Sequence, residues 1–285
     1  MTAPTTTGLG ARIGGGARLL WIFGITQLKC LAFAIALFVA MAVTDVVDTP
    51  IGRYDLLLIA GLTITAVLWW TGYETAREVG VIAAFHLLGL TLEIFKVAQG
   101  SWTYPDDGIT MVAGVPLYSG FMYAAVGSYL CQAWRRFDLR ITRYRTVPMA
   151  ILAVAAYLNF FTHHWIWDLR WAIAAAFVAA MWGTFVHYSV AERRLRMPLA
   201  VAFVLIGFFL WAAENVGTFL GAWQYPDQAD LWRAVHVGKL GSWALLVTLS
   251  FVIIATLKQY EGTFYGHPGD RPSVGAGDDP EAQPS

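Results

Sequence analysis

The chain has 285 residues, of which 58% are hydrophobic and 13% charged, with a mean hydropathy of +0.56. Lys plus Arg and Asp plus Glu each number 19, so the net charge is zero. Because soluble domains carry about 25% charged residues, this composition excludes a water-soluble globule. The balanced charge excludes nucleic acid as a partner, since there is no basic excess to neutralise phosphates.

Eight apolar stretches are each long enough to cross a bilayer as a helix, which takes about 20 residues. Residues 1–18, rich in Gly and Thr, form a cytoplasmic leader, and residues 259–285, rich in Gly, Pro, Asp and Ser, form a disordered tail. The sequence therefore predicts an all-α polytopic membrane protein with eight transmembrane helices. The predicted helices are residues 19–43, 54–70, 78–98, 111–134, 148–165, 171–190, 198–220 and 234–257.

The positive charges are distributed unequally between the two sides of the membrane. Thirteen of the 19 Lys and Arg residues fall in segments on the side of the N-terminus, whereas Arg53, Arg170 and Arg233 fall in the opposite loops. Cytoplasmic segments retain Lys and Arg. This asymmetry predicts that both termini are cytoplasmic and that the protein is a multi-pass protein of a bacterial-type plasma (inner) membrane.

One motif occurs twice in the chain. Glu93 is followed after six residues by GSWTYPD, and Glu214 is followed after six residues by GAWQYPD, an offset of 121 throughout. The same offset places the fifth to eighth predicted helices over the first to fourth. The sequence therefore predicts two parallel four-helix repeats, residues 19–134 and 148–258, joined by an Arg-rich cytoplasmic linker at 135–147, with a site at their interface.

Seventeen of the 19 acids can be placed in loops, at helix ends or in the tail, and the other two, Glu93 and Glu214, lie deeper inside predicted spans. An ionisable group within a membrane helix costs about 2.5–3.5 kcal/mol, so it normally faces the bundle interior and has a partner. Lys96 lies one helical turn from Glu93, and Lys239 could reach Glu214. The two glutamates are therefore the candidate catalytic groups, and the alternative is a pair of structural ion pairs that hold the halves together.

The repeated motif and nearby polar residues supply candidate substrate-binding groups at the outer end. The motif Gly ends a helix, Trp and Tyr suit the membrane interface and Pro-Asp makes a turn, so an aromatic anchor is the alternative. Adjacent histidines on a helix diverge by about 100° and make no metal motif. No metal is predicted. The alternative is a composite metal site made by His163 or His164 together with His236 and the two glutamates. The candidate binding residues are Trp102, Tyr104, Asp106, Trp223, Tyr225, Asp227, Lys96, Lys239, His163, His164, His236 and His86.

Two family resemblances follow from these motifs. Glu93, the segment GSWTYPDDGI and the VPLY at 115–118 resemble membrane-integral lycopene cyclases and carotenoid hydratases over about 40 residues. Those cyclases carry a PxEE-type acid pair where this chain has Pro116, Leu117, Tyr118 and Ser119. The eight spans, the WTYPD and WQYPD copies and the HLLGLTLEIFK stretch are more similar to the YoaT-like bacterial integral-membrane family of unknown function, which implies no activity.

Two functions fit these residues, and the first is slightly favoured. One is an enzyme acting on a polyene or other isoprenoid lipid, in which Glu93 or Glu214 protonates a double bond for cyclisation or hydration and aromatic faces stabilise the cation. The other is a transporter of a small solute or a proton-coupled cation. A long apolar cavity would favour the enzyme and a polar vestibule the transporter. Membrane lipid is a partner in both cases, and the sequence determines neither the cofactor nor the oligomeric state.

Overall fold

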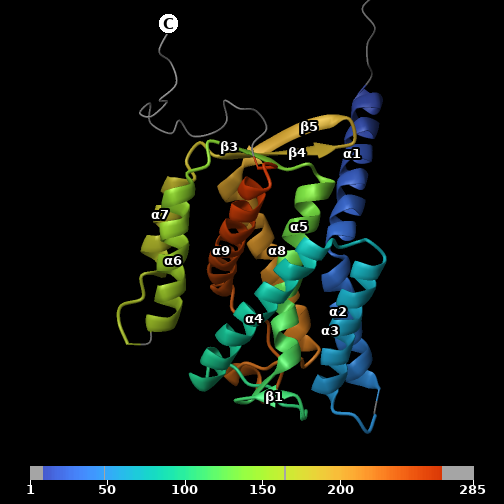
Figure 1. Cartoon of the computed structure of the whole chain (residues 1–285), viewed down its shortest axis with the longest axis vertical. Helices are drawn as coiled ribbons and strands as arrows, with labels where there is room; N and C mark the ends of the chain where they lie inside the picture. Colours follow the sequence, from blue (N-terminus) through green and yellow to red (C-terminus); the bar gives the residue numbers. More distant parts are fainter. Residues whose placement is uncertain (1–8, 48, 164, 265–285) are drawn as a thin grey trace, which may run out of the picture.

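The computed structural model describes residues 9–47, 49–163 and 165–264, which form a bundle of helices (Figure 1). Helices α1 and α2 run in the same direction and the helices after them alternate in direction, so the first and last described residues lie at the same end of the bundle. The predicted leader before residue 9 and tail from residue 265 lie outside the described residues. The helices are α1 (Leu9–Cys30), α2 (Ala32–Val46), α3 (Arg53–Trp70), α4 (Ala76–Ala98), α5 (Gly120–Arg136), α6 (Thr146–Thr162), α7 (Arg170–Ala180), α8 (Leu199–Phe219) and α9 (Lys239–Tyr260), with single 3₁₀ turns η1 (Leu117–Ser119) and η2 (Pro226–Gln228).

A small antiparallel sheet lies at the end of the bundle where α1 begins (Figure 1). Its strands β3 (Arg140–Thr142), β4 (Phe185–Val190) and β5 (Arg193–Pro198) follow the order β3-β4-β5. The predicted helix over 171–190 is therefore wrong in its second half. Helix α7 ends at Ala180, the chain turns at Gly183 with φ of +76°, and residues 185–190 then pair with strands on both sides. Such pairing is set by tertiary contact and overrides local apolar character.

The opposite end of the bundle carries a short hairpin between α4 and α5. Strands β1 (Met111–Val112) and β2 (Val115–Pro116) pair around Ala113 and Gly114, both with positive φ. The predicted span 111–134 therefore becomes helical only from Gly120. Helix α1, in contrast, begins at Leu9, ahead of the predicted start of the first span at residue 19.

Four helices, α3, α4, α8 and α9, are long and apolar enough to cross a membrane, and the α1–α2 pair, bent by 65°, would be a fifth. Helix α7 has 11 residues and is about 16 Å long, whereas a bilayer core is about 30 Å thick. The prediction of a mostly helical protein is thus confirmed, with four or five candidate membrane spans among the described residues, and the prediction of eight spans stays a prediction.

Glycines let the helices approach one another closely, as small residues do between membrane helices. A Cβ at Gly61 of α3 would lie 2.3 Å from the Phe121 ring on α5. A Cβ at Gly89 of α4 would lie 2.4 Å from the ring of Tyr123, also on α5. These contacts place the first turns of α5 directly against α3 and α4, and the second contact fixes the position of Tyr123 relative to the helix that carries Glu93.

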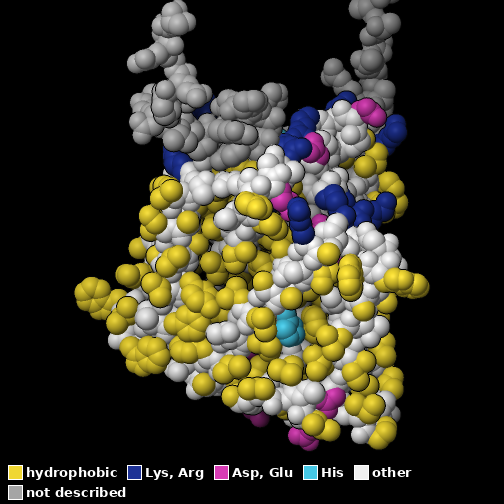
Figure 2. Space-filling view, in the orientation of Figure 1, with side chains coloured by type: hydrophobic (Ala, Val, Ile, Leu, Met, Phe, Trp, Pro, Cys, Tyr) yellow, Lys and Arg dark blue, Asp and Glu magenta, His cyan; other side chains and the backbone are white. Residues whose placement is uncertain are grey.

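The surface separates into an apolar middle and a charged end (Figure 2). Hydrophobic side chains cover the middle of the bundle, and many large ones are exposed, such as Phe209 and Leu87. Lys and Arg gather at the end that carries the sheet, where β5 contributes exposed arginines. An apolar belt next to a basic end is typical of a membrane-associated protein.

Candidate functional site

Glu93 lies on α4 and is 3% exposed. The indole Nε1 of Trp102 and the hydroxyl of Tyr104 both donate to its Oε2 at 2.7 Å. The hydroxyl of Tyr123 on α5 donates to its Oε1 at 2.8 Å. Burial, together with the neighbouring carboxylate, raises the pKa of the Tyr104 phenol well above its ordinary value, so this hydroxyl stays a donor. The Glu93 carboxyl is therefore enclosed by three aromatic donors.

Glu214 occupies the corresponding place on α8 and is 4% exposed. The hydroxyl of Tyr225 donates to its Oε1, and the indole Nε1 of Trp243 on α9 donates to its Oε2 at 2.6 Å. Lys239, at the first residue of α9, donates from Nζ to the Tyr225 hydroxyl oxygen at 3.2 Å. Both motif glutamates thus accept hydrogen bonds from the motif tyrosine eleven residues later in the chain and from an aromatic residue of the following helix.

The helices that carry the two glutamates end in the same way. Gly100 after α4 has φ of +67°, and Gly221 after α8 has φ of +64°. The N–H of Ser101 donates to the carbonyl oxygen of Lys96 at 3.0 Å, and the N–H of Ala222 donates to that of Gly217 at 3.1 Å. This is the helix end that a left-handed glycine permits, and in each copy it turns the motif back toward the glutamate.

The two motif copies contact each other directly. Thr103 and Gln224 form an antiparallel bridge in which each N–H donates to the other's carbonyl oxygen at 2.9 Å. The rings of Trp102 and Tyr225 meet edge to face with centroids 5.9 Å apart. The ammonium of Lys239 lies 4.3 Å from the centroid of the Tyr225 ring and 5.5 Å from that of Trp102, within cation–π range of both. The glutamate sites of the two copies are therefore neighbours.

The described residues show no ion pair at either glutamate, in contrast to the alternative of structural ion pairs. Among the ion pairs of the described residues, none includes Glu93 or Glu214. The Nζ of Lys96 lies 4.2 Å from the centroid of the Phe160 ring on α6, so this lysine is directed toward another helix. The spacing along α4 places Lys96 near Glu93 in sequence, but the Lys96 side chain packs over the Phe160 ring of α6.

The motif aspartates are placed differently from the motif aromatics. Asp106 accepts from Arg53 Nη1 at 2.8 Å, and its N–H donates to the Tyr54 hydroxyl at 3.1 Å, so it ties the first motif to the start of α3. Asp227 is exposed at the turn η2. Trp223 is 8% exposed and lies against Gly217, where an added Cβ would be 2.2 Å from its ring. Among the described residues, none of these three side chains forms a hydrogen bond with a motif glutamate.

The predicted histidines do not converge on the glutamates. His163 ends α6, with Nδ1 2.9 Å from the Phe160 carbonyl oxygen, and His236 is exposed and accepts from the Gly238 N–H at 3.0 Å. His86 faces Phe121 on α5, with ring centroids 4.4 Å apart. His164 lies outside the described residues. Within the described part of the chain, no three His, Cys, Asp or Glu side chains are grouped as a metal site would require.

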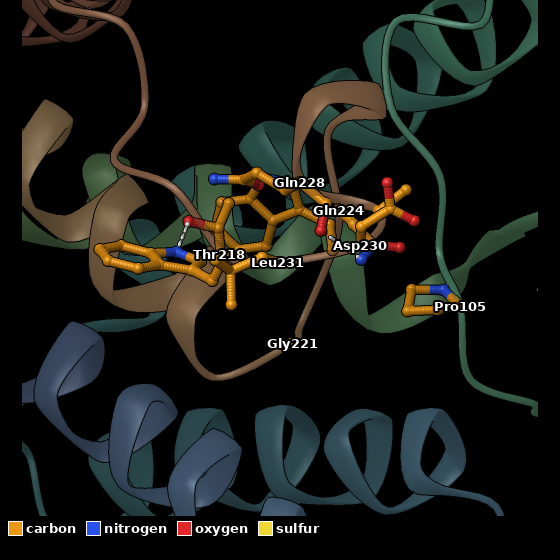
Figure 3. Close-up of a pocket in the computed structure, with 10 residues that line it drawn as sticks. Pro105, Thr218, Gly221, Gln224, Gln228, Asp230 and Leu231 are labelled. Carbon is orange, nitrogen blue, oxygen red and sulfur yellow. Dashed lines mark hydrogen bonds between the residues drawn. The ribbon is translucent and has the colours of Figure 1, made fainter.

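A pocket of about 190 Å³ opens beside the second motif (Figure 3). Thr218, one turn after Glu214, donates to the Glu214 carbonyl oxygen and accepts from the Trp232 indole at 3.2 Å. The rest of the wall is mixed, with the amides of Gln224 and Gln228 and the carboxylate of Asp230 beside apolar side chains. The pocket is lined by Pro105, Thr218, Gly221, Trp223, Gln224, Gln228, Ala229, Asp230, Leu231 and Trp232.

Comparison with known proteins places the chain in a family. Residues 19–251 match the family described as "Protein of unknown function (DUF817)". The chain belongs to this family. Over 241 residues it is 50% identical to the "Uncharacterized protein YoaT" of Bacillus subtilis (strain 168), which covers 83% of this chain and 90% of that protein. No solved structure matches the chain. The resemblance to the YoaT-like family is confirmed, and the resemblance to carotenoid enzymes stays a prediction.

Several residues of the site were not predicted from the sequence. Tyr123 and Trp243, which complete the two glutamate cages, lie on α5 and α9, outside the repeated motif. With the offset of 121, Tyr123 aligns with Ala244 and not with Trp243, so the repeat does not predict that Tyr123 and Trp243 have the same role. Arg53 was assigned only to an outer loop, yet its guanidinium bonds to the second motif as well as to Asp106. Contacts of this kind depend on the faces that the helices turn to each other.

Proposed function

We propose that this protein is a membrane carrier that exchanges protons for a small cation, with Glu93 and Glu214 as its proton-binding carboxyls. The observation that supports it is the pair of buried carboxyls held by aromatic donors instead of cations. A tyrosine hydroxyl can donate or accept. A proton on Oε1 of Glu93 can therefore be donated to the Tyr123 oxygen, while Trp102 and Tyr104 keep their bonds to Oε2, so the carboxyl can change charge without losing its partners.

The acid-catalysed isoprenoid enzyme is less well supported by this geometry. A general acid has to present its proton to the reacting atom of the substrate. Both oxygens of Glu93 face donors of the protein itself, and the side chain is almost fully enclosed. The pocket next to the second motif is small and has Thr218, Gln224 and Asp230 in its wall, which favours a polar solute over a polyene chain.

Hydrogen bonds connect Glu214, through Tyr225, with the ammonium group of Lys239 at the start of α9. Lys239 donates to the Tyr225 oxygen, and Tyr225 in turn donates to Glu214. When the Lys239 proton moves to the Tyr225 oxygen, the Tyr225 proton moves to Glu214. The ammonium and carboxylate then become an amine and a carboxylic acid with no net change of charge. A small cation in the pocket, whose lining includes Asp230, Trp223 and Trp232, would lie beside Thr218, which is one helical turn from Glu214.

Tyr225→Phe tests this proposal. We expect the variant to lose at least about tenfold of the cation-driven proton movement, because the ring remains but the hydroxyl that relays the proton is gone. The measurement is the fluorescence of a pH dye entrapped in proteoliposomes after addition of Na⁺, K⁺ or tetramethylammonium. Tyr129→Phe is the matched control, since its hydroxyl bonds to Gln27. Equal rates for Tyr225→Phe and wild type, or a wild type that moves no protons and retains a polyene through purification, would reject the carrier.

We also propose that both ends of the chain are cytoplasmic and that the two halves are parallel repeats. Three observations support this: the alternation of helix directions, the basic sheet end, and the matching ends of α4 and α8 at an offset of 121 (Figures 1 and 2). A two-fold axis along the membrane normal would then pass between the contacting motifs, as in parallel-repeat transporters.

The orientation is tested with single added cysteines. The native Cys30 and Cys131 are 1% and 0% exposed, so they give little background. A membrane-impermeant maleimide is expected to label Ile109→Cys, which is next to the first motif and 95% exposed, in intact cells. Glu192→Cys, in the exposed turn between β4 and β5, should be labelled only after permeabilisation. The reverse pattern would place the sheet outside.

A further inference from the structure

A further buried carboxyl lies at the other end of α4, in the loop that joins α3 to it. Glu74 is 1% exposed. Its Oε1 is 2.5 Å from the hydroxyl oxygen of Ser128 on α5. Its Oε2 is also buried and has no hydrogen-bond partner among the described residues. A buried carboxylate with a free oxygen is costly, whereas the acid form needs only the Ser128 contact, in which it can donate its proton.

A matched acid one turn later has the opposite surroundings. Glu78 is 5% exposed, yet its Oε2 accepts from the Thr75 N–H at 2.7 Å and lies 3.4 Å from Arg135 Nη2. Glu78 therefore has both a cation and a backbone donor, as an ionised carboxylate requires. Two acids near the start of α4 therefore differ in their surroundings. Glu78 has a cation and a backbone donor beside it, and Glu74 has no cation paired with it among the described residues.

The charged groups around Glu74 do not neutralise it. On α5, Arg135 is engaged with Glu78 and the Tyr73 carbonyl oxygen, and Arg136 lies over the Tyr73 ring and donates to Gln132. On α9, Lys258 pairs with Glu261, which also faces Arg77 of α4. No ion pair of the described residues includes Glu74.

Burial raises the pKa of Glu74 from 4.5 to about 7, with the neighbouring Glu78 adding to the rise. The folded protein therefore holds this proton at pH values where the unfolded chain has released it. The proton-bound fold is favoured at acid pH, and this contribution to stability is lost as the pH rises through about 7. The group changes charge within the range of cytoplasmic pH.

We propose that Glu74 is a second proton-binding site, which exchanges protons with the basic side of the membrane while Glu93 and Glu214 serve the other side. Helix α4 connects the two sites, because Glu74 directly precedes its first turn and Glu93 lies near its last. His86 lies between them, seven residues before Glu93 and so on the same helix face. Its Nδ1 is buried without a hydrogen-bond partner among the described residues, which leaves it able to accept a proton. The role in exchange rests on the proposed carrier function.

The test is labelling with dicyclohexylcarbodiimide, an apolar reagent that reacts with protonated carboxyls, followed by peptide mass spectrometry of the full-length protein in detergent. We expect labelling of Glu74 at pH 6 that falls with a midpoint near pH 7, and no labelling of Glu78, which is the internal control in the same peptide region. Glu74→Gln should remove the label without changing the elution of the protein in size-exclusion chromatography. Equal labelling of the two acids, or no label on Glu74 at pH 6, would overturn the proposal.

The same variant separates this site from the carrier function. In proteoliposomes, Glu74→Gln is expected to slow cation-driven proton movement at least tenfold and to abolish its dependence on internal pH between 6 and 8, while Tyr129→Phe on α5, whose hydroxyl bonds to Gln27, keeps that dependence. If labelling is found but the wild type moves no protons, the carrier fails and the proton site remains. If protons move and Glu74→Gln has no effect on rate or pH dependence, the site plays no part in exchange.

Discussion

Glu93→Gln is expected to abolish cation-driven proton movement while the protein still folds and inserts. The amide can reproduce the protonated carboxyl: its oxygen accepts from Trp102 and Tyr104, and its NH₂ donates to the Tyr123 oxygen, which can accept. The buried hydrogen bonds are therefore kept and the protein can fold, but the amide can no longer release a proton. The measurement is the dye-based proton assay in proteoliposomes, together with the yield of monodisperse protein.

Glu93→Leu is the contrasting variant. Its side chain is apolar and leaves the donors of Trp102, Tyr104 and Tyr123 without an acceptor. Each unsatisfied buried donor costs about 1–3 kcal/mol, so we expect a loss of several kcal/mol and a clearly lower thermal unfolding midpoint. Should Glu93→Gln also fail to fold, or should it retain full proton movement, Glu93 would be a structural acceptor and not a proton-binding group.

Arg53→Met is expected to destabilise the protein by about 2–4 kcal/mol, because it leaves polar groups of two distant segments unpaired. The guanidinium is 14% exposed and donates to Asp106 at 2.8 Å. It also donates to the carbonyl oxygen of Leu220 at 2.5 Å and to that of Gly221 at 3.3 Å, at the start of the second motif. The expected loss of stability is at the lower end of what breaking a buried ion pair costs, because Asp106 is 37% exposed.

The measurement for Arg53→Met is the thermal unfolding midpoint in detergent, with Arg170→Met as control. Arg170 pairs with Asp168 at 2.6 Å, but both side chains are 37% exposed, so its loss should change stability by less than about 1 kcal/mol. Equal midpoints for the two variants would show that Arg53 does not hold the motif copies together. Reduced proton movement at normal stability would instead place Arg53 in the transport step.

Much of the candidate site could be predicted from the sequence. An acid within an apolar stretch is rare enough to single out Glu93 and Glu214, and both are buried where aromatic motif residues return to them. The motif glycines predicted the helix ends, since positive φ at Gly100 and Gly221 is a local property of the backbone. The partners of the acids were predicted as lysines, and this was wrong because aromatic hydroxyl and indole groups from neighbouring helices occupy those positions.

The sequence by itself indicated a membrane protein, and it determined that several helices are apolar and that one end is basic. Hydropathy, charge and turn residues act within short segments, so they can be summed along the chain. Only the tertiary structure decided that residues 185–190 form a strand, that Arg53 joins the two motifs, and that Glu74 is buried without a counter-charge. These features depend on the rotation and tilt of helices far apart in sequence, which no local pattern specifies.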